Sequence, residues 1–463
     1  MALNSKILLL LPDGVGLRNF VYSDFINLGK NWGIETVVWN NTPFDLKGME
    51  VKEIQLQGKP SPKTDLLKRA RIDIQLKTFE RQTGNPVFTS YRFTPATKTL
   101  KQKIKNSIVK YYSKTYQNNL SGLRKKLQQS ERNTTYYQAC LATLKQEQPA
   151  LVFCTNQRPV NAIAPLTAAQ DLGIPTATFI FSWDNLPKAT MVVETDYYFV
   201  WSAHMKAELL FYYPYIREHQ IIISGTPQFE MHFDARLKQT KTAFCNEHEL
   251  DVNKRYLCFS GDDITTSPHD PYYLEETAKA VRKVNAEGGH WQILFRRSPV
   301  DFSGRYDAVL STFKSEISEL PPLWKQVGDQ WNAVMPSPED NRRLLNTVAH
   351  SELIINVGSS MVFDGICHGV PTAYINYNPT QEPVKKDIQS IYKYIHFQSM
   401  PKEAPVYWLN NPEALPEILT NLDHPKENTL EAARSWFQTI NEHPPQKASE
   451  RIWEGIEKIL NND

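Results

Sequence analysis

The fold of this 463-residue chain is indicated by the stretch 353–375, which has the sequence LIINVGSSMVFDGICHGVPTAYI. The apolar run Leu353–Asn356 predicts a short buried strand. A Gly-Ser-Ser loop follows it, and the apolar spacing of Ser360–His368 predicts a helix. Gly-Val-Pro then ends the helix, and Thr372–Ile375 predicts the next strand. A strand, loop, helix and strand within 23 residues predict a parallel β/α unit.

The same alternation of short apolar runs and amphipathic segments continues outward through the chain. Further strands are expected at Ile7–Leu11, Thr36–Trp39, Ala150–Cys154, Thr176–Phe181, Tyr197–Trp201, Gln220–Ile223, Tyr256–Phe259 and Trp291–Phe295. Helices are expected between them, among them Arg18–Trp32, Pro159–Leu172, Ala203–Tyr213, Pro271–Ala286 and Glu339–Ala349. This pattern predicts an α/β protein with two Rossmann-like, doubly wound sheets whose strand ends face one cleft.

The length also favours two domains, since single cores rarely grow beyond about 300 residues. We expect an N-terminal domain over residues 1–225, interrupted by a helical insertion at about 60–148, and a linker over 226–253. A C-terminal domain over 254–427 and closing helices over 428–463 complete the prediction.

Composition narrows the functional class. Hydrophobic residues make up 41% and charged residues 22%, which is typical of a globular protein. A net charge of +2 gives no indication of a nucleic-acid partner. The five cysteines (Cys140, Cys154, Cys245, Cys258 and Cys367) have no disulfide or metal-binding spacing, which favours a reducing compartment. No apolar run is long enough for a membrane span, so a soluble or peripheral cytoplasmic protein is expected.

The loop at residues 358–360 has the composition of a phosphate site. Gly358 lets a ligand approach the backbone, while Ser359 and Ser360 offer hydroxyl and N–H groups at the start of a helix, where anions bind. Asp364 lies one turn further on, where a carboxylate can accept hydrogen bonds from two ribose hydroxyls. A plain helix cap and a solvated aspartate are the structural alternative.

The segment from Gly358 to Ile375 resembles the donor-nucleotide signature of GT-B glycosyltransferases. The resemblance extends to Asp196–Trp201 and to Ile223–Pro227, and Ser182–Leu186 resembles a sequence of bacterial surface-polysaccharide glycosyltransferases. It implies a nucleotide-sugar donor, with a UDP-sugar as the first expectation, and a glycan or lipid-linked glycan acceptor. It also implies that neither a cofactor nor a tightly held metal ion is needed.

Three other segments are candidates for donor contacts. Gly261, in a loop after a predicted strand, is expected to face the phosphates. Arg296 and Arg297 follow another strand, and a guanidinium there suits phosphate oxygens, with an exposed salt bridge as the alternative. Gln381 and Glu382 lie where such enzymes commonly hold sugar hydroxyls.

The expected chemistry requires a base that takes a proton from the acceptor hydroxyl. Asn356 stands where retaining members of the resembled group often carry an acidic residue, which favours inversion. No histidine precedes His204, so a base on the N-terminal domain is expected to be a carboxylate. Asp13 directly follows the first strand, and Asp184 is its competitor.

Residues near these two carboxylates are expected on the acceptor side. Gly14 and Gly16 form the loop after the first strand, and Arg18 begins the helix that follows. Trp183 offers a flat face to a sugar ring or base, and Asn185 lies two positions further on. An Asx-turn around Asp13 and an ordinary surface arginine are the structural alternatives.

Other functions remain open on the same fold. Glycerophosphate transferases fit the motifs almost as well. A nucleotide-sugar 2-epimerase fits less well, because this sequence lacks the histidine and acidic clusters expected in the cleft of such an enzyme. A non-catalytic sugar-nucleotide binder is the alternative from another functional class.

The insertion is unusually basic. From Arg81 to Ser130 it contains eleven Lys or Arg residues and no Asp or Glu. Within residues 98–126, the residues Leu100, Ile104, Ile108 and Tyr111 form an apolar stripe. Lys98, Lys101 and Lys105 flank the stripe, and Lys110, Lys114 and Arg124–Lys126 continue the positive charge. This pattern predicts a helix that lies on an anionic membrane surface. A scaffold helix packed on the sheet and a site for a polyanionic glycan are the alternatives.

Overall fold

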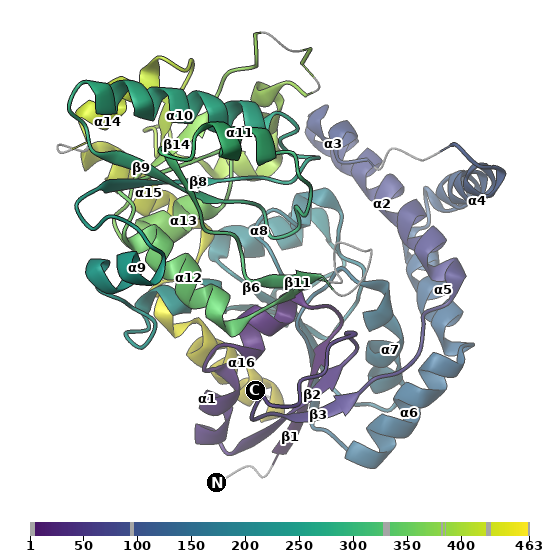
Figure 1. Ribbon diagram of the computed structural model, residues 1–463. Helices are drawn as coiled ribbons and strands as arrows, with labels where there is room; N and C mark the ends of the chain where they lie inside the picture. The colour runs from purple at the N-terminus through teal and green to yellow at the C-terminus, as the bar shows by residue number, and fades with distance from the viewer. Residues whose placement is uncertain are drawn as a thin grey trace. The chain divides into compact units, whose positions relative to one another are not determined.

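The computed structural model describes residues 5–92, 97–326, 334–380, 383–384, 386–422 and 427–461. The chain divides into two compact units, unit 1 (residues 1–227 and 440–463) and unit 2 (residues 228–439). Each unit is built around one parallel sheet with helices packed on it (Figure 1). The predicted fold class, α/β with two doubly wound domains, is therefore confirmed.

Unit 1 contains a seven-stranded parallel sheet in the order β3-β2-β1-β4-β5-β6-β7. Its strands are β1 (Ser5–Leu11), β2 (Ile34–Asn40), β3 (Lys52–Gln55), β4 (Leu151–Cys154), β5 (Thr176–Phe179), β6 (Tyr197–Val200) and β7 (Ile221–Ile223). β1 lies between β2 and β4, and its side chains from Ile7 to Leu11 are fully buried. A strand covered on both faces has no polar side, which explains the continuous apolar run.

The helices of unit 1 largely follow the predicted pattern. They include α1 (Phe25–Asn31), α7 (Ile163–Asp171), α8 (Ala203–Tyr212) and α16 (Ala448–Leu460). The single helix expected over Arg18–Trp32 is wrong, because a π-helical turn (Leu17–Val21) precedes α1. The Ser23 hydroxyl donates to the Asn19 carbonyl and accepts from the Phe25 amide, so it replaces backbone bonds of a continuous helix.

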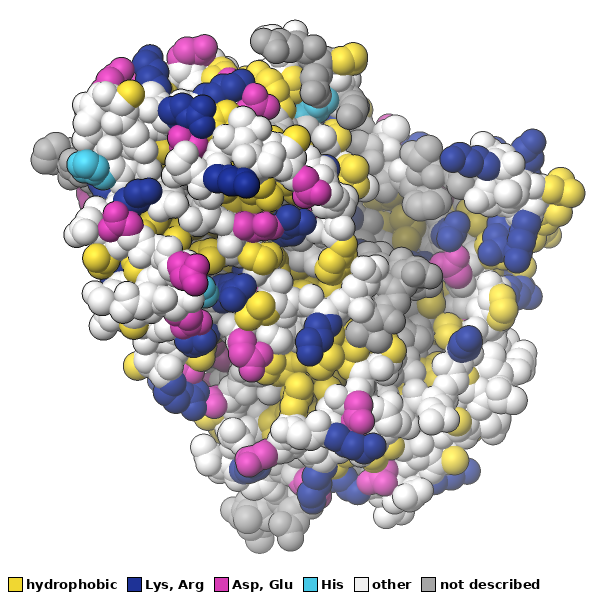
Figure 2. Space-filling model, viewed as in Figure 1, with side chains coloured by type: hydrophobic (Ala, Val, Ile, Leu, Met, Phe, Trp, Pro, Cys, Tyr) yellow, Lys and Arg dark blue, Asp and Glu magenta, His cyan; other side chains and the backbone are white. Residues whose placement is uncertain are grey.

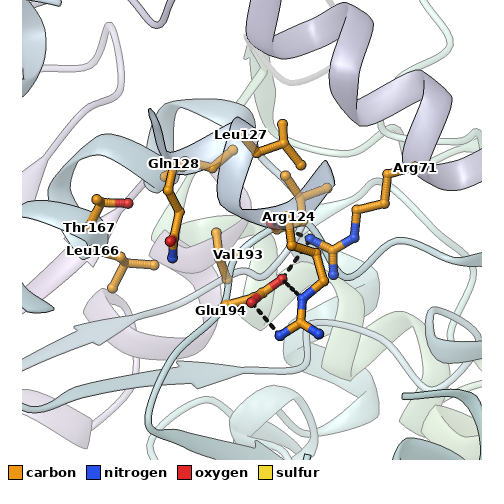
Figure 3. Close-up of a pocket in the computed structure, with 10 residues that line it drawn as sticks. Arg71, Arg124, Leu127, Gln128, Leu166, Thr167, Val193 and Glu194 are labelled. Carbon is orange, nitrogen blue, oxygen red and sulfur yellow. Dashed lines mark hydrogen bonds and ion pairs between the residues drawn. The ribbon is translucent and has the colours of Figure 1, made fainter. Parts of the chain in front are cut away.

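The insertion expected at about residues 60–148 consists of five helices. They are α2 (Pro62–Thr83), α3 (Val87–Ser90), α4 (Leu100–Tyr116), α5 (Leu120–Arg132) and α6 (Thr135–Glu147). Partly buried ion pairs tie it to the loop that precedes β6: Glu194 accepts from Arg124 at 2.5 and 2.7 Å and pairs with Arg71 at 3.2 Å (Figure 3). Arg124 therefore does not belong to the exposed basic surface in which the sequence analysis placed it.

Unit 2 contains a six-stranded parallel sheet in the order β10-β9-β8-β13-β14-β15. Its strands are β8 (Arg255–Ser260), β9 (Trp291–Arg296), β10 (Ile317–Glu319), β13 (Leu353–Asn356), β14 (Thr372–Ile375) and β15 (Tyr407–Leu409), and β11 (Trp324–Gln326) pairs with β12 (Val334–Pro336) as a separate ribbon. Its helices are α9 (Lys241–Glu247), α10 (Asp270–Ala286), α11 (Asp307–Thr312), α12 (Pro338–Ala349), α13 (Met361–Ile366), α14 (Ala414–Thr420) and α15 (Glu427–Ile440).

Two segments outside the predicted domains pack into defined cores. In the expected linker, Phe244 and Cys245 of α9 are buried against Tyr256 and Leu294 of unit 2. At the C-terminus, α16 returns to unit 1, where the Trp453 ring stacks on Phe25 at 4.7 Å. Trp453 Nε1 also donates to the Phe25 carbonyl at 2.8 Å. Aromatic burial thus ties α16 to α1.

Candidate functional site

In an open parallel sheet, the two strands at which the chain reverses its direction of winding leave a crevice at their carboxyl ends, and ligands bind there. In unit 2 this point lies between β8 and β13, because β8 leads to β9 and β10 while β13 leads to β14 and β15. In unit 1 it lies between β1 and β4. Gly358–Ser360, Gly261 and Asp13 fall in loops that follow these strands, whereas Arg296 and Arg297 follow β9 and Asp184 follows β5.

The loop after β13 has a backbone shape that requires glycine. Gly358 adopts φ +67°, and a Cβ there would lie 2.9 Å from the ring of Phe397. The Ser359 amide donates to the Asn356 side chain at 2.8 Å, which holds the turn together. Ser360 begins α13 without a side-chain capping bond, and both serines are half-buried. Both serines thus lie in the turn that leads into α13, and phosphate binding there stays a prediction.

Asp364 lies one turn into α13, but its carboxylate is not open to solvent. It is 3% exposed, and its Oδ1 lies 2.8 Å from His232 Nε2. His232 Nδ1 lies 3.0 Å from His368 Nε2. A carboxylate accepts, so His232 carries its proton on Nε2 and accepts at Nδ1 from His368. The sequence analysis placed Asp364 correctly on the helix but missed this histidine pair.

His368, the outer member of the histidine pair, is neutral near pH 7. Burial lowers the pKa of His368 to about 4, and the neighbouring His232 ring adds to this effect. The side chain of His232 is fully buried. The two rings thus form a hydrogen-bonded chain that ends on the Asp364 carboxylate and holds its orientation. His232 and His368 are 136 residues apart, so no spacing in the sequence links them.

The two arginines after β9 are both engaged in ion pairs. Arg296 is buried and donates to Asp340 at 2.8 Å, while its Nη1 is buried without a protein partner. Arg297 donates to Glu319 at 2.5 and 2.9 Å. A phosphate contact by Arg297 would have to replace Glu319, whereas Nη1 of Arg296 retains an unused donor. Phosphate binding by either side chain stays a prediction.

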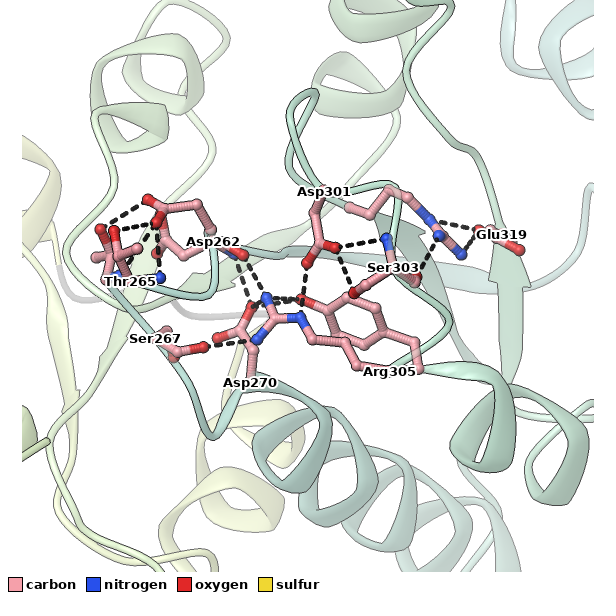
Figure 4. Close-up of polar contacts among 12 residues, drawn as sticks. Asp262, Thr265, Ser267, Asp270, Asp301, Ser303, Arg305 and Glu319 are labelled. Atoms are coloured by element: carbon pink, nitrogen blue, oxygen red, sulfur yellow. Dashed lines mark hydrogen bonds and ion pairs between the residues drawn. The ribbon is translucent and has the colours of Figure 1, made fainter. Parts of the chain in front are cut away.

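The loop after β8 is a dense acidic network (Figure 4). Gly261 has no space for a side chain, because a Cβ would lie 2.9 Å from the Tyr306 hydroxyl. Asp270 accepts from the Asp262 amide at 2.7 Å and from Tyr306 at 3.0 Å. Burial raises the pKa of Asp270 to about 6, and burial together with Asp270 raises that of Asp262 well above its usual range. Arg305 donates to the Asp262 carbonyl at 2.5 Å.

Gln381 and Glu382, predicted to hold sugar hydroxyls, lie outside the described residues.

In unit 1, one hydrogen bond spans the reversal point. Asp13, after β1, accepts from Asn156, after β4, at 2.8 Å. It also accepts from the Val15 amide at 3.2 Å, which is the Asx-turn considered from the sequence. Asp13 is 3% exposed, and burial raises its pKa to about 6 despite these donors and the charge of Arg158. A carboxyl group with this pKa is a suitable base near neutral pH.

The rest of the loop supports Asp13 by close packing. Gly16 has no space for a Cβ, which would lie 2.3 Å from the Thr155 hydroxyl. Gly14 is buried and its carbonyl accepts from the Leu17 amide. Arg18 is half-buried in the π-helical turn that follows.

The loop after β5 places Asp184 among partners of its own. Its Oδ1 accepts from Ser182 at 2.6 Å and from Asn185 at 2.8 Å, and its Oδ2 pairs with Lys188. Trp183 and Asn185 are buried, and Asn185 also accepts from Gln157 at 2.9 Å. Both carboxylate oxygens of Asp184 are therefore engaged by neighbouring side chains. Trp183 does not offer an open ring face.

Glu208 on α8 is a carboxyl group that the sequence analysis missed. Burial and the charge of Asp184 raise its pKa to about 8, and its Oε2 is buried without a protein partner. It is therefore largely protonated at neutral pH. Its only sequence signal is its position four residues after His204, and their side chains are 3.7 Å apart.

Comparison with known proteins identifies the fold. No protein-family model and no curated protein matches the chain by sequence. Among solved structures, a protein assigned as a UDP-N-acetylglucosamine 2-epimerase from Listeria monocytogenes matches with a TM-score of 0.56 at 10% identity, over 99% of this chain and 97% of that one. The chain has the GT-B fold.

Two further solved structures share this GT-B fold. A glycosyltransferase from Rickettsia africae matches with a TM-score of 0.54 at 11% identity, over 99% of both chains. The S. aureus protein MnaA, in a co-structure with UDP, matches with a TM-score of 0.53 at 12% identity, over 99% of this chain and 97% of that one. At such identities the likeness shows the fold and leaves the activity open.

Within the described ranges, no group of three or more His, Cys, Asp or Glu side chains is arranged to hold a metal ion. In the same part of the chain, no helix is long and apolar enough to cross a membrane.

Proposed function

We propose that this chain is a nucleotide-sugar-dependent glycosyltransferase that binds its donor at the reversal point of unit 2. The observation that carries the proposal is the Gly358 loop after β13, at the reversal point of the sheet, whose left-handed glycine and half-buried serines suit a diphosphate. The same fold holds UDP in the S. aureus structure, which makes a UDP-sugar the first donor to test.

In this proposal, Ser359 and Ser360 bind the diphosphate and Asp364 binds the ribose. His232 holds one carboxylate oxygen of Asp364 at 2.8 Å, so the ribose hydroxyls approach the other oxygen after a small movement of the loop. Arg296 contributes through its unused Nη1. These donors offset the negative charge that develops on the departing diphosphate.

Asp13 is proposed as the base that deprotonates the acceptor hydroxyl. Asn156 fixes one of its oxygens at 2.8 Å, and the pKa of about 6 leaves the carboxylate ionised yet basic at pH 7. The hydroxyl oxygen then attacks the anomeric carbon as the bond to the diphosphate breaks, and the proton remains on Asp13. Direct attack inverts the anomeric configuration, and no resident metal ion or cofactor takes part.

The acceptor is proposed to be a hydroxyl group of a glycan or a lipid-linked glycan.

The proposed location is a reducing cytoplasm. All five cysteines are free, and four are buried, which agrees with this location.

A nucleotide-sugar 2-epimerase is the second candidate. The sequence analysis found no histidine or acidic cluster for it, but the structure brings together His232 and His368, and separately Asp262 and Asp270. Such groups are suited to moving protons on a bound sugar. Two of the matched structures are linked by name to this activity or to UDP.

A donor screen separates these functions. The chain is incubated with UDP-, GDP-, CDP- and CMP-sugars and with CDP-glycerol, and products are resolved by anion-exchange chromatography. A glycosyltransferase releases nucleotide by slow hydrolysis, and faster once its acceptor is added. An epimerase converts UDP-GlcNAc into its C2 epimer, and release of glycerol phosphate indicates the glycerophosphate transferase. Binding without any product would leave only a sugar-nucleotide binder.

The proposed contact between Asp364 and the donor ribose is tested by a substitution of Asp364. Asp364→Asn keeps an oxygen for His232 but removes the charge, so nucleotide affinity should fall about ten- to a hundredfold, as expected for a charge-assisted hydrogen bond. Asp171→Asn, on the surface of unit 1, is the control. Unchanged affinity in folded Asp364→Asn would remove Asp364 from the donor site.

A further inference from the structure

Helix α4 carries two apolar faces, and only one of them is packed against the protein. Val109, Tyr112 and Tyr116 are partly buried against the core of unit 1, and Ser113 is buried beside α2. These four positions recur at spacings of three, one and three residues, so they form one face of the helix. The helix is therefore packed against unit 1, as the scaffold alternative required, but through these four residues and not through the predicted apolar stripe.

The predicted stripe lies on the other side and is exposed. The exposed fractions are 75% for Leu100, 53% for Ile104 and 65% for Tyr111, and Ile108 between them is half-buried. Spacings of four, four and three residues align these side chains along the helix. Exposed large apolar side chains gathered on one face mark an interaction surface rather than a random exposure.

Lysines border the exposed stripe on both sides. With 3.6 residues per turn, Lys103, Lys110 and Lys114 form one row, and Lys101 and Lys105 lie on the opposite side of the stripe. The helix has no acidic residue. Figure 2 shows basic and hydrophobic side chains gathered where α4 lies. We call the exposed stripe together with these five lysines the α4 surface.

A basic groove of about 710 Å³ adjoins this surface, between α2 and α4. Some of its charges are neutralised within it: Lys77 pairs with Asp73 at 2.6 Å and Arg92 with Glu80 at 2.7 Å. Within the described part of the chain, Arg81, Lys110 and Lys114 line the groove and have no carboxylate partner. The groove therefore has an excess of positive charge next to the apolar stripe.

We propose that the α4 surface docks on an anionic membrane, with its apolar stripe at the boundary between the headgroups and the acyl chains and the groove binding a lipid phosphate. An amphipathic helix with basic borders lies in the plane of such an interface. Lys110 and Lys114 contribute to both parts, since each lines the groove from α4. Membrane docking requires neither the sugar donor nor the acceptor, so it can be tested independently of the proposed catalytic function.

Vesicle sedimentation with the full-length protein tests the docking. Vesicles of phosphatidylcholine with about 30% phosphatidylglycerol are compared with pure phosphatidylcholine, each at low and high salt. We expect binding to the anionic vesicles that weakens with salt, because exposed charges are screened over about 10 Å at 0.1 M. Equal binding to both vesicle types, or binding to neither, would overturn the proposal.

Two double variants separate the apolar and basic parts. Lys110→Gln/Lys114→Gln should weaken vesicle binding about 25-fold, since each basic residue near an anionic surface contributes about fivefold. Leu100→Gln/Ile104→Gln should weaken it at least tenfold, since both side chains leave the headgroup layer. Both pairs are exposed, so thermal stability should stay unchanged.

The matched controls are exposed residues of unit 2. Lys314→Gln/Lys402→Gln removes the same charge elsewhere, and Val252→Gln removes an exposed apolar side chain; neither should alter vesicle binding. Binding of heparin, a soluble polyanion, is measured as the final comparison. If heparin binds as tightly as the vesicles and Leu100→Gln/Ile104→Gln leaves vesicle binding intact, the surface is a polyanion site and the membrane proposal is wrong.

Discussion

Replacing Asp13 by asparagine should make the protein more stable and inactive at the same time. Burial raises the pKa of this carboxyl from 3.8 to about 6, so its charged form costs the folded state about 3 kcal/mol at pH 8. Asparagine is uncharged and nearly isosteric. It has one oxygen for the Val15 and Asn156 donors, and the lost hydrogen bond costs about 1 kcal/mol. The free energy of unfolding of Asp13→Asn should therefore exceed that of the wild type by about 2 kcal/mol at pH 8.

The stability difference between Asp13→Asn and the wild type should increase with pH. A carboxyl group whose pKa is raised on folding stabilises the native state fully below its unfolded pKa, and this contribution is lost as the pH rises through about 6. The Tm of Asp13→Asn should therefore exceed that of the wild type by about 4–8 °C at pH 8. At pH 4 the difference should vanish or reverse, since wild-type Asp13 is then largely protonated.

Scanning calorimetry from pH 4 to pH 8 measures this difference, and the donor assay measures turnover. Loss of the base should lower kcat by about 10²- to 10⁴-fold with donor affinity unchanged. Asp171→Asn is the control, because Arg132 lowers the pKa of Asp171 and its removal should destabilise at pH 8. If Asp13→Asn lowers Tm at pH 8, or shifts it equally at every pH, Asp13 serves the turn and the reasoning on its burial is wrong.

Three further outcomes follow from the structure. Gly358→Ala should lower nucleotide affinity at least tenfold by calorimetric titration, because φ +67° costs an L-residue about 1–2 kcal/mol and the Cβ would lie 2.9 Å from Phe397; wild-type affinity would remove this loop from the donor site. His368→Gln should lose less stability than the wild type between pH 6.5 and 4, because a histidine pKa lowered on folding costs stability as the pH falls through that range; parallel unfolding curves would contradict this. Asp184→Asn should keep most of the turnover that Asp13→Asn loses, since Lys188 already holds its charge, and the opposite ranking would make Asp184 the base.

The α/β architecture was accessible from the sequence because its signals are local. A strand buried on both faces needs a continuous apolar run, and the five side chains from Ile7 to Leu11 show it. The helices between strands need apolar residues at helical spacing, which the chain also supplies. The Gly358 position was likewise visible, since a glycine after a strand indicates a backbone that other residues do not adopt.

The state of the site residues depended on partners distant in the chain. Asp13 has its pKa raised by burial and is oriented by Asn156, 143 residues away. Asp364 is engaged by His232, 132 residues away, and Arg296 by Asp340, 44 residues away. Residue types and spacing name the groups that can ionise, but burial and charge partners set their protonation and orientation.

The α4 helix shows the same division between sequence and structure. Sequence by itself determined that residues 100–116 form an amphipathic, basic helix, because periodicity and charge are properties of the segment alone. It did not determine which apolar face meets the core. Only the tertiary structure decided that Val109, Tyr112 and Tyr116 pack inward while Leu100 and Ile104 stay exposed. A helix with two apolar faces can bury either one, and the shape of the neighbouring α2 selects between them.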